Sequence, residues 1–141
     1  MSLDRVVAGL GLGLAAALAA GMVAGAFGRS EQPSAIEIRV HFSHFEPASI
    51  SVPAGRPITF VLVNTDPIDN EWIVGDEATH LRHRTGTEPA HESRPSEVTL
   101  PALTERRTTV TFTKPGTLTF VCHLPGHEAY GMTGTLVVTG G

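Results

Sequence analysis

The sequence predicts an all-β domain of about seven or eight short strands, preceded by an apolar N-terminal segment. Beyond that segment Gly, Pro and Thr are frequent and long Ala, Leu, Glu or Lys stretches are rare, which favours strands and turns over helices. Hydrophobic and polar residues repeatedly alternate, as they do in half-buried strands. The length of 141 residues allows one ordinary domain and excludes a multi-domain enzyme.

The composition narrows the class of protein further. Ten Lys plus Arg against fourteen Asp plus Glu give a formal net charge of −4. The chain therefore lacks the excess of positive charge that is typical of nucleic-acid-binding proteins. Hydrophobic residues make up 41% and charged residues 17%, so the chain is too apolar to be disordered. Because Cys122 is the single cysteine, no internal disulfide can form. The domain must therefore be held by its core, by a metal, or by both.

The N-terminal segment is long enough to span a membrane. Residues 6–27 carry no charge and would span ~33 Å as a helix. Asp4 and Arg5 replace the basic start of a secretory signal, whereas Ala24 and Ala26 match an A-x-A cleavage pattern. An uncleaved anchor and a cleaved signal both fit better than a buried soluble helix, and either one exports the rest of the chain.

These features define the expected organisation of the chain. Residues 1–29 are a signal peptide or transmembrane anchor, residues 30–35 a polar linker, and residues 36–141 the folded domain. We expect the protein on the outer face of the cytoplasmic membrane if the segment is uncleaved, and secreted or periplasmic if it is cleaved.

Four strands are expected in the first half of the domain, at residues 36–42, 49–52, 57–63 and 71–74. In the first of these, apolar and polar side chains alternate, so one face packs on a core. The third is a nearly continuous apolar run, which suits a central strand covered on both sides. Trp72 in the fourth is assigned to packing, in the core or near the site, rather than to a redox relay.

A polar stretch at residues 76–97 separates the two halves and is expected to be a long loop or flap, because it shows no sustained periodicity. Lys114-Pro115-Gly116 marks a turn in the second half. The second half carries four further strands, at residues 98–100, 110–112, 118–120 and 136–138. Strands of this number and spacing normally form a two-layer antiparallel sandwich.

Three sulfur and nitrogen side chains lie close together near the C-terminus. Cys122, His127 and Met132 occur at C-x4-H-x4-M spacing between the last two expected strands. A Cys that ends one strand can meet a His and a Met on the loop that returns to the next. Thiolate and thioether select Cu(I), and imidazole suits both copper states, whereas zinc rarely uses Met. The spacing therefore indicates a copper site.

With these residues the chain resembles the cupredoxins, the blue copper proteins typified by plastocyanin and azurin. The resemblance covers roughly residues 36–139, including FEPASISVPAGRPITFVLVNTDP and TFVCHLPGHEAYGMTGTLVV. It implies a Greek-key β-sandwich with one copper ion at one end and one-electron transfer to redox protein partners. By position, Cys122 would be the thiolate ligand, His127 the imidazole at the solvent edge and Met132 the weak axial thioether.

One ligand of the family pattern is missing. The pattern places a His at the start of the strand after the turn at Asn64, and Asn70 stands there. Copper would then bind through Cys122, His127 and Met132 with Asn70 or water in the fourth position, which favours Cu(I) because a carboxamide oxygen is a hard, weak donor. A second alternative is that a histidine of the loop supplies the imidazole, namely His80, His83 or His91. A third is a degenerate site that retains the fold with weak metal binding.

The other histidines of the domain are not expected to bind the same ion. His123 follows Cys122 and should point to the opposite face, while His41 and His44 are assigned to the surface. We expect an exported copper protein, not an enzyme, that transfers single electrons or carries Cu(I). A β-sandwich binding or structural module is the alternative. A thiol enzyme is less favoured, because no Asp or Asn is evidently placed to orient a base beside Cys122.

Overall fold

Residues 34–85 and 94–140 are described in a computed structural model of the chain. The apolar run at 6–27, most of the expected linker and His91 lie outside the described residues. Within residues 34–85 and 94–140, no helix is both long enough and apolar enough to cross a membrane.

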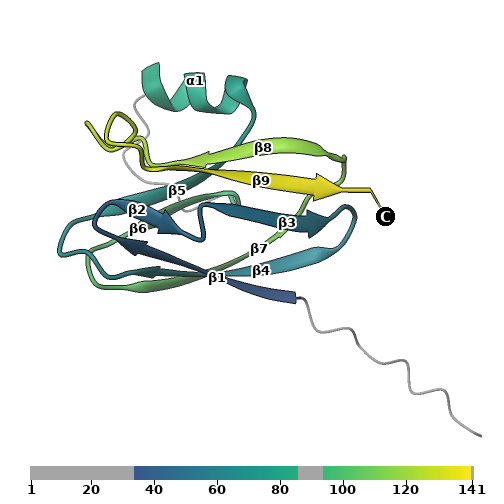
Figure 1. Cartoon of the computed structure of the whole chain (residues 1–141), viewed down its shortest axis with the longest axis horizontal. Helices are drawn as coiled ribbons and strands as arrows, with labels where there is room; N and C mark the ends of the chain where they lie inside the picture. Colours follow the sequence, from purple (N-terminus) through teal and green to yellow (C-terminus); the bar gives the residue numbers. More distant parts are fainter. Residues whose placement is uncertain (1–33, 86–93, 141) are drawn as a thin grey trace, which may run out of the picture. The chain divides into compact units, whose positions relative to one another are not determined.

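The described residues form a two-layer β-sandwich with one helix outside it (Figure 1). One sheet has the strand order β2-β1-β4-β7 and the other β3-β9-β8-β5-β6. This confirms the expected all-β sandwich. The elements are β1 (Ser34–His41), β2 (His44–Glu46), β3 (Ser49–Pro53), β4 (Pro57–Asn64), β5 (Asn70–Gly75), α1 (Glu77–Thr85), β6 (Glu97–Leu100), β7 (Glu105–Thr111), β8 (Gly116–Val121) and β9 (Thr133–Thr139).

Two strand pairs differ from the antiparallel arrangement that the spacing predicts. β1 runs parallel to β4, with Ile36 opposite Phe60, and β3 runs parallel to β9, with Ile50 opposite Leu136. Parallel partners need a crossover, and here the chain makes it by passing through the opposite sheet before it returns. Alternation along a strand shows which side chains face the core but not the direction of the neighbour, so the sequence pattern does not contain this feature.

The core lies between the sheets and is built from the inward faces of the expected strands. Trp72, Phe60 and Phe120 are fully buried, and the rings of Phe60 and Trp72 lie 4.8 Å apart. The assignment of Trp72 to packing is therefore correct. Gly134 on β9 is required by this packing, because a Cβ there would lie 2.1 Å from ring atoms of Phe120.

The expected flap is wrong for residues 77–85, which form the helix α1. Asp76 caps the helix, since its Oδ1 accepts hydrogen bonds from the backbone N and Oγ1 of Thr79, both at 2.9 Å. These bonds lower the pKa of the Asp76 carboxyl. Gly75 lets the first turn approach, because a Cβ there would lie 2.5 Å from Cβ of Thr79. α1 lies against the outer face of the sheet that contains β5 and β8 (Figure 1).

Candidate metal centre

The loop between β8 and β9, residues 122–132, holds all three of the closely spaced candidate ligands. It begins with a tight turn in which Leu124 O accepts a hydrogen bond of 3.0 Å from His127 N. Pro125 and Gly126 occupy the central positions, and Gly126 has a φ of 88°. This is the arrangement of a type II turn, in which Pro presets the first central position and Gly tolerates the positive φ of the second. The turn folds His127 back toward Cys122.

Two further backbone bonds close this β8–β9 loop. Met132 N donates to His127 O at 3.1 Å, and Cys122 N donates to Met132 O at 3.2 Å. Gly131, with a φ of 91°, makes the second sharp bend just before Met132. These bonds hold the backbones at positions 122, 127 and 132 close together. Such closeness is required if the three side chains of the C-x4-H-x4-M pattern are to share one ion.

The Cys122 thiol lies in contact with the His127 imidazole. Cys122 is fully buried, and its Sγ is 3.3 Å from His127 Nδ1 and 3.3 Å from Glu71 N, which donates to it. Burial raises the pKa of the thiol to about 11, although the backbone amides of Leu124 and Glu71 act in the opposite direction. Without a metal the group is therefore a protonated thiol beside an imidazole nitrogen.

The same separation suits metal binding. Metal–sulfur and metal–imidazole bonds are about 2.3 Å and 2.0 Å, so two atoms 3.3 Å apart can reach one ion. A metal would displace the thiol proton, because the thiolate is the ligand form.

Asn70 begins β5 next to this pair and is completely buried. Its Nδ2 donates to Asn64 Oδ1 at 3.1 Å, while its Oδ1 has no hydrogen-bond partner among the described residues. A buried carbonyl oxygen without a partner is costly unless something else satisfies it. The next amide along the chain, that of Glu71, donates to Cys122 Sγ, so the backbone at the start of β5 lies beside this thiol.

These donors fit copper better than they fit zinc. Met132 is fully buried at the end of the same loop, and its thioether joins the Cys122 thiol, the His127 imidazole and the Asn70 carboxamide in the set of candidate donors. Across residues 34–85 and 94–140, no three side chains from His, Cys, Asp and Glu gather as a metal site. Two of the four candidate donors are sulfur atoms, and sulfur donors are preferred by copper.

The two described loop histidines are engaged elsewhere. His80 places Nδ1 2.9 Å from His123 Nε2 and Nε2 2.7 Å from Thr119 Oγ1. His83 donates from Nδ1 to Thr79 O at 2.8 Å. His123 contacts α1, in agreement with the expectation that it points away from the side of Cys122. The sequence analysis missed that His80 is buried against the sheet, although the His-x-x-His spacing of a helix was the available signal.

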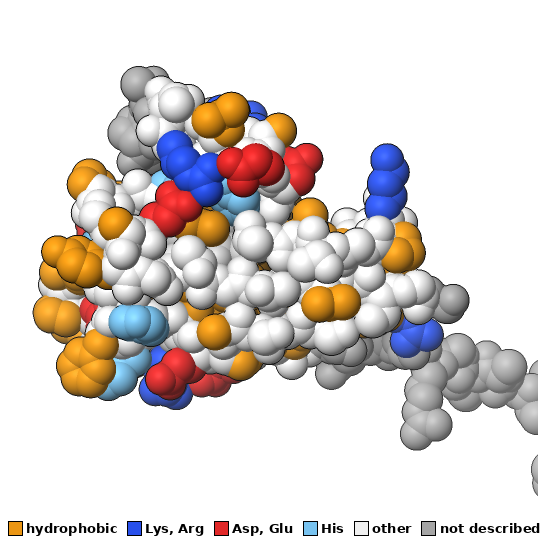
Figure 2. Space-filling view, turned by 45° about the horizontal axis from the view of Figure 1, so that its top comes forward, with side chains coloured by type: hydrophobic (Ala, Val, Ile, Leu, Met, Phe, Trp, Pro, Cys, Tyr) orange, Lys and Arg blue, Asp and Glu red, His pale blue; other side chains and the backbone are white. Residues whose placement is uncertain are grey.

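Exposed hydrophobic side chains gather at the end of the sandwich that carries the β8–β9 loop (Figure 2). They come from the β1–β2, β4–β5, β6–β7 and β8–β9 connections, all of which lie at this end. Phe42 and Tyr130 are each more than three-quarters exposed, at 78% and 77%. The residues are Phe42, Ile68, Leu103 and Tyr130.

The fold defines a protein class, a cupredoxin-like sandwich, and at one end of it Cys122 and His127 lie in contact. The family model described as a cupredoxin-like domain matches residues 12–138. The chain belongs to this family.

The chain is also similar to three known proteins. The copper-resistant cuproprotein CopI of Rubrivivax gelatinosus is 32% identical over 67% of this chain, which spans 59% of the length of that relative. The CopI protein of Pseudomonas aeruginosa is 29% identical over 80% of this chain and 82% of its own length. The structure of reduced auracyanin from the photosynthetic bacterium Roseiflexus castenholzii is 25% identical, with a TM-score of 0.64 over 75% of this chain and 97% of that chain.

Proposed function

We propose that this protein is an exported, non-enzymatic copper protein that holds one ion through Cys122, His127 and Met132, with Asn70 in the position of a second imidazole. The observation that carries the proposal is the 3.3 Å separation between the buried Cys122 Sγ and His127 Nδ1. The oxygen of Asn70, which lacks a partner among the described residues, supports its place as the fourth donor.

The donor set favours Cu(I) over Cu(II). Cys122 and Met132 are soft donors, and one imidazole remains where the family pattern has two. A cuprous ion is satisfied by such a set, whereas Cu(II) prefers more nitrogen. We therefore propose Cu(I) carriage as the activity, and the similarity to two copper-resistant cuproproteins supports this choice.

One-electron transfer is the second candidate, and a specific observation favours it. The exposed Tyr130 lies on the same loop as His127, and Phe42, Ile68 and Leu103 extend the apolar surface around that end. Such a surface suits transient docking of a redox protein partner, exported or in the membrane. Similarity to auracyanin, solved in a reduced form, supports the same reading.

Copper titration of the full-length protein tests the proposal. We expect one equivalent of Cu(I) to bind in competition with a coloured Cu(I) chelator. Cys122→Ser should weaken binding by more than about a hundredfold, because even ligand-supporting residues are worth 10- to 100-fold. The matched control is His44→Gln, which removes an exposed imidazole. Equal binding by the wild type and Cys122→Ser contradicts the assignment of the site.

The oxidised protein separates the two candidate activities. Tight Cu(II) binding with an intense thiolate charge-transfer band in the unmodified protein would favour electron transfer over Cu(I) carriage. Absence of bound copper at micromolar concentration, under both reducing and oxidising conditions, would instead favour the structural module. A thiol enzyme is opposed by the burial of Cys122, since a reactive cysteine needs a lowered pKa and access to substrate.

A further inference from the structure

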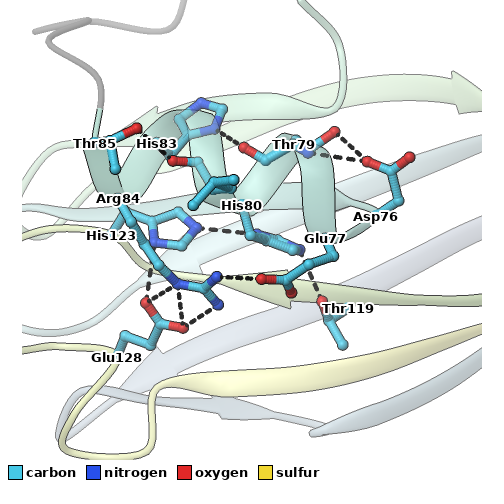
Figure 3. A network of polar contacts seen from close by, with 11 residues as sticks. Asp76, Glu77, Thr79, His80, His83, Arg84, Thr85, Thr119, His123 and Glu128 are labelled. Atoms are coloured by element: carbon cyan, nitrogen blue, oxygen red, sulfur yellow. Dashed lines mark hydrogen bonds and ion pairs between the residues drawn. The ribbon is translucent and has the colours of Figure 1, made fainter.

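The helix α1 contacts the β8–β9 loop at two points (Figure 3). His80 meets His123 through ring nitrogens 2.9 Å apart. Arg84 holds the carboxylate of Glu128 with a fork of hydrogen bonds: Nε lies 3.0 Å from each oxygen and a terminal nitrogen lies 2.7 Å from Oε1. Charge-assisted bonds of this two-pronged kind fix orientation as well as distance.

The two contacted residues occupy special positions in the loop. His123 directly follows Cys122, and Glu128 directly follows His127. Each candidate ligand that forms the 3.3 Å pair is therefore one residue away from a contact with α1. A shift of the helix would move both backbone positions.

α1 is itself attached to the sheet beneath it. His80 reaches Thr119 on β8, with Nε2 2.7 Å from Oγ1. Further along the helix, Arg82 and His83 contact the carboxylate of Glu97, which begins β6 and is buried. The helix thus connects β6 and β8 to the loop that follows β8.

Apolar packing does not explain why the helix is there. His80 is the buried residue of α1, and Leu81 is 55% exposed. A surface helix of a globular protein usually has an apolar stripe that faces the core. Here the contacts are polar and are directed in large part at the β8–β9 loop.

We propose that α1 is a clamp on the β8–β9 loop, in which His80 and Arg84 are positioning residues that hold the loop in the conformation that brings Cys122 and His127 together. The relevance of the clamp to copper rests on the proposed function, whereas its action on the loop does not. Neither residue touches the candidate ligands; each acts through its partner on the loop.

The first test uses the metal-free, full-length protein. Arg84→Met removes the fork, and we expect alkylation of Cys122 and hydrogen exchange at the amides of His127 and Met132 to accelerate about tenfold. The matched control is Arg39→Met, which breaks an exposed Arg–Glu pair on β1. Rates equal to those of the wild type in Arg84→Met, in a protein with unchanged far-ultraviolet circular dichroism, overturn the clamp.

A double-mutant cycle and a second variant guard against simple loss of the helix. Glu128→Gln should accelerate alkylation to the same extent, and Arg84→Met combined with Glu128→Gln should add nothing further. His80→Gln keeps a polar side chain of similar size and should loosen the loop independently. Additive effects of Arg84→Met and Glu128→Gln would contradict a shared contact.

The loaded protein supplies a readout that a purely structural role would not move. With Co(II) as a spectroscopic probe, the thiolate charge-transfer band should shift in Arg84→Met and shift less in Arg84→Lys, which keeps the charge but not the fork. An identical band in all three proteins overturns the positioning role. If the wild type binds no metal while Arg84→Met still loosens the loop, the proposed function fails and the clamp stands.

Discussion

Asn70 gives the centre its particular character at the scale of single residues. Its side chain is fully buried, it donates to Asn64, and its oxygen is directed to no hydrogen-bond partner among residues 34–85 and 94–140. An imidazole at this position would supply a second nitrogen donor, which stabilises Cu(II).

Asn70→His is therefore expected to create an intense thiolate-to-Cu(II) charge-transfer band. Visible absorption and electron paramagnetic resonance of the copper-loaded oxidised protein measure it. Asn70→Ala is the control, since it removes the carboxamide without adding nitrogen and should show no such band. A spectrum of Asn70→His that matches the wild type would contradict the role given to this position.

Gly134 illustrates how closely one position in the core is packed. An added Cβ would lie 2.1 Å from the Phe120 ring and 2.9 Å from Ala48 O, so neither neighbour can remain in place. Gly134→Ala should lower the free energy of unfolding by about 1–3 kcal/mol, measured by denaturant titration. Gly140→Ala, where an added Cβ meets nothing within 4 Å, should change it by less than about 0.5 kcal/mol.

At the scale of elements, Glu97 joins α1 to β6. Burial raises the pKa of its carboxyl, but the hydrogen bond from Arg94 and the charges of His83, Arg94 and Arg82 outweigh burial, so the net shift is downward. A lowered pKa means that the ionised carboxylate stabilises the folded state. This stabilisation is present above the unfolded pKa of about 4.5 and is lost as the pH falls through the lower, folded value.

Glu97→Gln is expected to lower the free energy of unfolding by about 1–2 kcal/mol near pH 7. The loss stays this small because Arg82 and Arg94 are about half exposed, so water can solvate them in the variant. The difference from the wild type should shrink as the pH falls below 4.5, and denaturant titrations across this range measure it. Glu105→Gln, in an exposed pair with Arg107, should have little effect at any pH. A difference independent of pH would mean that packing rather than charge is responsible.

The elements show what a single sequence reveals and what it does not. Alternation located the strands that supply the core, because burial of one face leaves a period of two. It did not reveal β2, which has three residues, or the parallel partners of β1 and β3, since direction leaves no mark on a strand's own pattern. It also missed α1, because a helix held by a cap and by polar contacts lacks the apolar stripe that identifies helices.

At the scale of the whole molecule, bound copper should stabilise the folded state. A ligand that binds the folded state and not the unfolded one adds about 2.7 kcal/mol at a free concentration one hundred times its Kd. We expect Cu(I) to raise the melting temperature of the wild type, measured by calorimetry under reducing conditions, and to leave that of Cys122→Ser unchanged. Mg²⁺, a hard cation, is the control. An equal rise in both proteins would show that copper binds elsewhere.

The candidate centre was predictable to a different degree from the network around it. Cys122, His127 and Met132 lie within one short loop, so their spacing alone indicated a shared site. The contact between His80 and His123 joins positions far apart in the sequence. It depends on the path of a helix that returns along the sheet, and no local pattern encodes that path.

The parallel pairing of β3 with β9 has a consequence for the order of assembly. β3 is an edge strand whose partner, β9, lies more than eighty residues further along the chain, so that edge cannot form before β9 has been synthesised. Long-range pairings of this kind are made late and slowly. Loss of β9 should therefore damage the candidate centre as surely as the loss of one of its donors, because that strand continues directly from Met132.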